Sequence, residues 1–109
     1  MKLGYNTNGL ACHRWQQALE LLAETGYRAV ALTLDHHLLD PYSTDLAHQL
    51  GEVRRTLDRL QLSVVVETGA RFLLNPKVKH DPTLLSPTPE QRNLRVDFLI
   101  RSLDIAAEL

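Results

Sequence analysis

The chain has 109 residues, the size of one small domain, and 44% hydrophobic with 23% charged residues indicates an ordinary globular protein with a core. Its formal net charge is −1 without any basic block, so it lacks the positive surface expected of a nucleic-acid partner. No apolar run could span a bilayer, no signal-peptide pattern opens the chain, and one cysteine excludes an internal disulfide, so we expect a cytoplasmic protein without a membrane partner.

The first half of the chain alternates short apolar runs with an amphipathic segment. Residues 2–7 predict a short strand, and residues 27–34, rich in apolar and β-branched side chains, predict a buried one. Between them, residues 13–26 predict a helix that ends at Gly26, where a left-handed cap is favoured. Its apolar residues recur at spacings of three and four and form one face: Trp15, Ala18, Leu19, Leu22 and Ala23.

The second half repeats the pattern. Residues 43–61 predict a helix that opens on a Ser/Thr/Asp cluster, and residues 62–68 predict a third strand. The face of that helix is Leu46, Leu50, Val53, Leu57 and Leu60. A last helix is predicted over residues 88–109, with Pro89 near its start, where the missing N–H costs nothing. Its face is Leu94, Phe98, Leu99, Ser102, Leu103, Ile105 and Ala106.

Strands that alternate with helices predict an α/β fold of parallel strands joined by right-handed crossovers. An open doubly wound sheet and a (β/α)8 TIM barrel with the helices outside both fit. One alternating set of strand residues is small and then polar toward the C-terminal ends: Gly4, Asn6, Ala31, Thr33, Asp35, His37, Ser63, Val65 and Glu67. The other set is apolar, as expected under helices, so the pattern favours a barrel whose lumen opens into an active site. The first turn also lacks a glycine-rich dinucleotide fingerprint.

A complete barrel takes about 250 residues. Residues 1–109 therefore correspond to the first three βα units, the N-terminal part of a single barrel domain, and we expect the chain to be a fragment. Three parallel strands alone leave apolar surface uncovered. We therefore expect either the remainder of the barrel or self-association to cover it.

Polar side chains gather at the predicted C-terminal ends of the strands, where barrel enzymes carry their chemistry. The candidates are Asn6 and Asn8; Asp35, His36, His37 and Asp40; and Glu67, Arg71 and His80. Imidazoles and carboxylates on one rim serve as metal ligands or as acid–base groups. The spacing His37-x-x-Asp40 would let the carboxylate orient the imidazole, with His36 facing away. Turn formation beside Pro41 explains the two aspartates equally well.

The connection over residues 68–90 is long for a compact domain, which is typical of lids and binding loops. It holds Arg71, Lys77, Lys79 and His80, which would face an anionic or polyhydroxyl ligand, although surface solubility explains Lys77 and Lys79 equally well. Five apolar residues would fix it on the body: Phe72, Leu73, Leu74, Leu84 and Leu85. The carboxylate of Glu67 needs a partner or water, and Arg71 is the nearest candidate, as a binding residue or as a structural ion pair alone.

The stretches "LGYNTNG", "GYRAVALTLDHHLLDP" and "VVVETGARFLLNPKVKHDPTLLSP" together resemble the sugar phosphate isomerase/epimerase group of the xylose-isomerase-like TIM-barrel superfamily. The resemblance covers the whole chain as the N-terminal portion of such a protein. It implies a (β/α)8 barrel that needs a divalent metal, manganese, magnesium, cobalt or zinc. His37 and Asp40 fall where xylose isomerases carry a histidine–aspartate pair that contacts a substrate oxygen and assists ring opening. The metal ligands of those isomerases come from later strands, so this segment alone is expected to hold no metal.

These observations predict the N-terminal part of a metal-dependent sugar or sugar-phosphate isomerase/epimerase, which abstracts a proton next to a carbonyl. His37 and Asp40 would be catalytic, and Asn6, Glu67, Arg71 and His80 would bind the small-molecule substrate. Two alternatives stay open: an endonuclease IV-like zinc phosphodiesterase, and a non-catalytic barrel that serves as a binding module.

Overall fold

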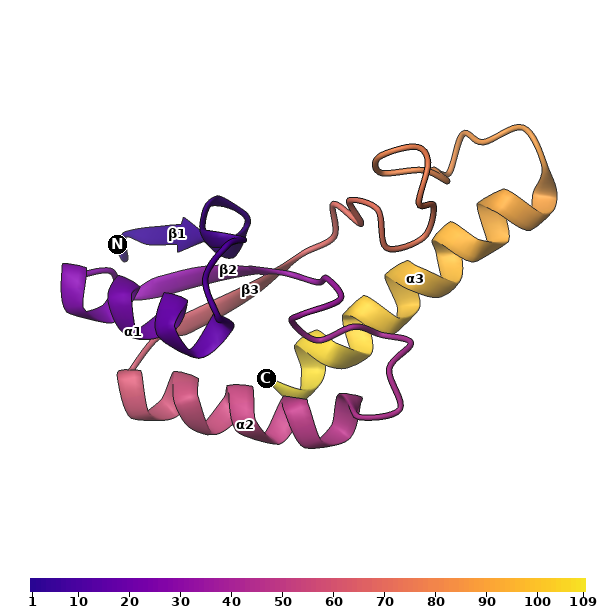
Figure 1. The fold of residues 1–109 in the computed structure, drawn as a ribbon. Coiled ribbons are helices and arrows are strands. Elements are labelled where there is room, and N and C mark those ends of the chain that lie inside the picture. Colours follow the sequence, from indigo (N-terminus) through magenta and orange to yellow (C-terminus); the bar gives the residue numbers. More distant parts are fainter.

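A computed structural model describes residues 1–109 as a three-stranded parallel sheet with three helices (Figure 1). Strands β1 (Gly4–Asn6), β2 (Ala29–Thr33) and β3 (Ser63–Glu67) lie in the order β1-β2-β3. Helices α1 (Trp15–Thr25), α2 (Leu46–Leu60) and α3 (Pro89–Glu108) follow them in turn. The α/β class and the three βα units are confirmed, and they are compatible with part of a (β/α)8 barrel. A short 3-10 helix, η1 (Thr7–Leu10), was not predicted.

The strand register places the small and polar residues on one face of the sheet. Asn6 pairs with Ala31, and Thr33 pairs with Glu67, so these side chains share a face. The helices lie together on the other side (Figure 1), where Val30 and Leu32 are buried. Nothing covers the polar face, on which Val65 is 64% exposed.

The hydrophobic core lies between the sheet and the helices. Leu19 and Leu22 of α1, Val53 and Leu57 of α2, and Phe98 and Ile105 of α3 are its buried helix residues. They meet Val30, Leu32 and Leu34 from the central strand and its extension. The predicted faces of α1 and α2 therefore point inward, whereas on α3 the predicted face is only partly covered, with Leu103 70% exposed.

The helix ends show why the boundaries fall where they do. Gly26 ends α1 with φ 106°, the left-handed cap that the sequence predicts, and Gln61 ends α2 in the same conformation with φ 54°. At the start of α3, Thr88 and Gln91 form a capping box in front of the first turn that Pro89 opens. Asp45 precedes α2 but its side chain makes no capping hydrogen bond.

The connection between β3 and α3 projects with the first half of α3 away from the sheet (Figure 1), and the chain measures 45 × 26 × 24 Å. Arg95 of α3 holds its start, donating from Nη2 to the carbonyl oxygen of Thr68 at 2.7 Å. Of the apolar residues expected to fix this loop, Leu73 and Leu74 do pack against the core. The expectation was wrong for the other three, Phe72, Leu84 and Leu85, which are exposed. No helix combines the length and apolarity needed to cross a membrane.

Candidate functional site

A row of polar side chains crosses all three strands at their C-terminal ends, on the uncovered face. The hydroxyl of Thr33 on β2 lies 2.8 Å from Oδ1 of Asn6 on β1 and 2.9 Å from Oε2 of Glu67 on β3. Thr33 is buried, whereas Asn6 and Glu67 are half-buried. Asn6 and Glu67 were predicted as substrate-binding residues. Thr33 was recognised only as a residue of the same face.

The row has more hydrogen-bond acceptors than donated hydrogens. The amide oxygen of Asn6 also accepts the backbone N–H of Asn8 at 2.7 Å, which fixes Oδ1 toward Thr33. The backbone N–H of Thr33 donates to Oγ1 of Thr7 in η1 at 3.0 Å. The hydroxyl of Thr33 therefore offers a single hydrogen to two acceptors, the Asn6 amide and the Glu67 carboxylate.

Arg71 was expected to pair with Glu67, but in the structure it pairs with Asp35. Its Nη1 donates to Oδ2 of Asp35 at 2.8 Å, and both side chains are mostly shielded from solvent. Oδ1 of Asp35 accepts the backbone N–H of His36 at 2.7 Å, so both carboxylate oxygens are engaged. The reason for the difference is local: Thr33 already engages Glu67, and the loop turns Arg71 toward the end of β2.

His80 and Arg71 lie in the same loop, between β3 and α3, and contact each other there. Ala70, Arg71 and His80 all have positive φ, at 59°, 46° and 66°, and so form a tightly folded corner. Nδ1 of His80 lies 3.1 Å from the backbone nitrogen of Arg71 and also contacts the carbonyl oxygen of Gly69. The backbone N–H of His80 donates to the carbonyl oxygen of Arg71 at 2.6 Å. The structure thus places His80 where it holds Arg71 in position.

His36 and His37 lie in a tight turn. Asp35 and Leu38 exchange backbone hydrogen bonds of 2.9 and 3.1 Å, so the strand alternation ends at Thr33. Nδ1 of His36 is 3.9 Å from Oδ2 of Asp40, so the carboxylate expected to orient His37 is beside His36. Oδ1 of Asp40 also accepts the N–H of Tyr42 at 2.9 Å, the turn role that the sequence left open.

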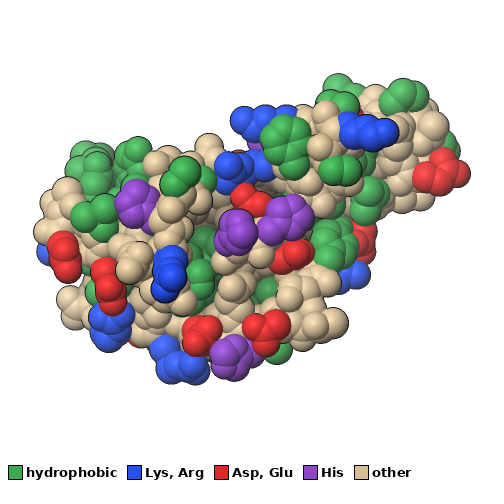
Figure 2. Space-filling view, viewed as in Figure 1, with side chains coloured by type: hydrophobic (Ala, Val, Ile, Leu, Met, Phe, Trp, Pro, Cys, Tyr) green, Lys and Arg blue, Asp and Glu red, His purple; other side chains and the backbone are tan.

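His37 lines a hollow beside the row. An inner cavity of about 40 Å³ is bounded by Thr7, Thr33, Asp35, His37 and Arg71. It adjoins a groove of about 330 Å³ along the start of α1, and His13, Trp15 and His37 line both. In Figure 2 histidines lie beside acidic and basic groups on this face. His13 is exposed and was not among the predicted site residues; the sequence placed it at the start of a helix, and the structure places it in the connection before α1.

A second polar cluster joins the β2–α2 connection to α3. The hydroxyl of Tyr42 donates to Oδ2 of Asp97 at 3.1 Å, and Arg101 donates to the same oxygen at 2.8 Å while its guanidinium lies over the Tyr42 ring. Burial, followed by the hydrogen bond to Asp97, raises the pKa of Tyr42 to about 12. The hydrogen bond from Arg101 lowers the pKa of Asp97. This cluster fixes the loop that carries Asp40.

The donor set does not form a metal site. No three histidine, cysteine, aspartate or glutamate side chains converge closely enough to hold an ion. The fold and the site define an α/β protein of three βα units, with polar groups gathered at the C-terminal ends of a parallel sheet. No protein-family model, curated protein or solved structure matches the chain.

Proposed function

We propose that the chain is the N-terminal part of a cytoplasmic, metal-dependent sugar or sugar-phosphate isomerase/epimerase of the (β/α)8 type. The observation that carries the proposal is the row Asn6–Thr33–Glu67, which joins the C-terminal ends of three successive parallel strands on the uncovered face. Active sites of (β/α)8 barrels occupy this position.

The contrast between the two faces supports a barrel over an open doubly wound sheet. In a doubly wound sheet helices cover both faces, and both are apolar. Here the helix-covered face buries Val30, Leu32 and Leu34, whereas the other face carries the amide, hydroxyl and carboxylate of the polar row. Polar groups gathered at the strand ends suit a face that lines a site.

The residues present suit recognition of a polyhydroxyl substrate next to a proton-transfer group. Asn6 and Glu67 offer hydrogen-bonding atoms to substrate hydroxyls, and His37 binds or protonates a substrate oxygen at the groove. Arg71 lines the same hollow, held by His80. Asp40, beside His36, acts by fixing the turn that carries His37.

A divalent metal would polarise the carbonyl oxygen during proton abstraction. The donors of residues 1–109 do not fit a complete metal site. Under the proposal its ligands belong to the remainder of the barrel, and we assign no step of the reaction to the metal here.

The test is proton exchange in the full-length protein that contains this chain. We expect it to exchange the proton next to the carbonyl of a ketose in D₂O when manganese is present, and to stop with EDTA. His37→Asn should slow exchange by about 100-fold, whereas His36→Asn should not. Proton NMR over a panel of ketoses and ketose phosphates measures both. Absence of exchange across the panel contradicts the proposal, and incision of abasic-site DNA with zinc would indicate the phosphodiesterase instead.

A further inference from the structure

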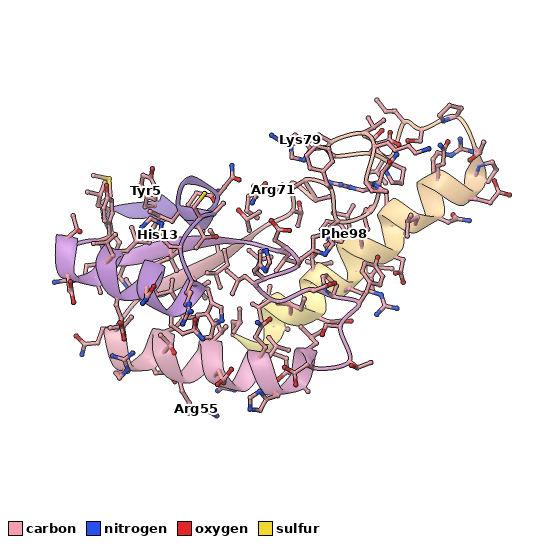
Figure 3. The ribbon with its side chains drawn as sticks, viewed as in Figure 1. Tyr5, His13, Arg55, Arg71, Lys79 and Phe98 are labelled. Carbon is pink, nitrogen blue, oxygen red and sulfur yellow. The ribbon has the colours of Figure 1, made fainter.

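We propose that the hollow between the β1–α1 connection, the Asp35–Leu38 turn and the β3–α3 loop binds an oxyanion, a phosphate or carboxylate group of the ligand. Arg71, His37 and His13 supply the donors, one from each of these segments. Figure 3 shows Arg71 nearer the strands than Lys79, which lies farther out on the same loop.

Arg71 is the principal donor because most of its hydrogen-bonding capacity is free. A guanidinium carries five N–H donors, and Asp35 accepts from Nη1. The ion pair anchors Nη1 of Arg71, and His80 contacts its backbone nitrogen. An Arg side chain held in this way presents a rigid fork that matches phosphate or carboxylate oxygens.

The charge balance of the hollow favours an anion. Asp35 is the one acid among its lining residues; Arg71 balances its charge, and its two oxygens each accept one hydrogen bond, from Arg71 and from the N–H of His36. His13 and His37 each offer an N–H donor in any protonation state. Arg14 adds a further positive charge along the groove. A ligand oxyanion entering here meets these donors, and the one carboxylate beside it is paired with Arg71.

The dimensions divide the hollow into two parts. The inner cavity of about 40 Å³ suits one small group, because pockets for whole small molecules are about 300–1,000 Å³. The adjoining groove of about 330 Å³ has room for the uncharged remainder of a small ligand. Asp35 and Cys12 also line the hollow, but no three potential metal ligands converge closely enough to hold an ion, so a cation is the poorer occupant.

The proposal deepens the proposed function, and rests on it only in taking the oxyanion to be part of the isomerase substrate. The test is direct binding to the 109-residue chain. Trp15 is the single tryptophan and lines both parts of the hollow, so its fluorescence reports occupancy. Inorganic phosphate and acetate separate the two sources of the oxyanion, and glycerol is the neutral control. Far-UV circular dichroism establishes that each variant is folded.

We expect saturable quenching or enhancement with phosphate, acetate or both, and none with glycerol. Arg71→Gln should weaken binding about tenfold or more, because it removes charged hydrogen bonds. His37→Asn should weaken it about threefold without touching the Asp35 ion pair, so the test stands even if Arg71→Gln does not fold. Lys79→Gln, which removes the same charge from an exposed position in the same loop, should bind as the wild type does.

No saturable response to either anion, or equal losses in Lys79→Gln and His37→Asn, would overturn the proposal. The two proposals fail separately. Ketose proton exchange without oxyanion binding would indicate a neutral substrate, and oxyanion binding without exchange would indicate a binding module.

Discussion

Replacing Thr33 with valine tests whether the polar row ties the strands together. The substitution keeps the shape of the side chain and deletes the hydroxyl that contacts Asn6 at 2.8 Å and Glu67 at 2.9 Å. Thr33 is 3% exposed, so water does not replace the lost contacts at its own position.

The magnitude follows from the hydrogen count. One hydroxyl hydrogen makes one donated bond, worth about 1 kcal/mol to the neutral amide and about 1.5–3 kcal/mol to an ionised carboxylate. Asn6 and Glu67 are half-buried, so hydrogen bonds from water replace part of the free energy that is lost with the hydroxyl. We therefore expect Thr33→Val to lower the free energy of unfolding by about 2 kcal/mol, which lowers the Tm of a domain of this size by on the order of 10 °C.

Urea unfolding followed by far-UV circular dichroism, at one fixed protein concentration, measures the change. Thr56→Val is the matched control, because Thr56 is a half-buried helix residue whose hydroxyl donates only to the carbonyl oxygen of Glu52; its effect should be about 0.5 kcal/mol or less. In Glu67→Gln the amide can donate to Thr33 while Thr33 donates to Asn6, so that variant should be at least as stable as the wild type. A Thr33→Val protein as stable as the control would refute the reasoning.

Two further outcomes are expected. Because the pKa of Tyr42 is raised from 10.0 to about 12, the neutral phenol stabilises the folded chain fully below pH 10, and this contribution is lost as the pH rises toward 12. The urea midpoint should therefore fall more steeply between pH 10 and 12 in the wild type than in Tyr42→Phe. Parallel curves for the two proteins would contradict this. Because Val65 is 64% exposed on the bare face and Leu103 70% exposed beside the free edge of β3, the isolated chain should self-associate. Val65→Lys should shift light-scattering mass toward the monomer, and a wild type that is monomeric at high concentration would argue against the expectation.

Periodicity predicted the elements of the fold well because the signals are local. The spacing of apolar residues by three and four located α1 and α2. Gly26 marked the end of α1, because glycine readily adopts the left-handed backbone conformation of the cap. The alternation within the strands placed Thr33 and Glu67 on one face, which the register confirms. The helix predicted to end at residue 61 does end there, but the left-handed conformation of Gln61 was not predicted, because glutamine, unlike glycine, gives no signal for it.

The pairing within the site could not be predicted, because it depends on loops. Alternation was extended past Thr33 to His37, but the Asp35–Leu38 turn stops it. The approach of Arg71 to Asp35 needs the left-handed corner of the third loop, for which Ala70 and Arg71 give no sequence signal. The sequence therefore identified the polar residues but not their partners.

The order β1-β2-β3 has a consequence for how the chain assembles during synthesis. β2 and β3 each pair with the strand that precedes them in the sequence, so each finds its docking edge already made when it emerges. β1 waits only for the next strand in the sequence, and β2 ends with a partner on each side. The sheet thus grows in one direction with the chain, and the edge that grows is always the newest strand.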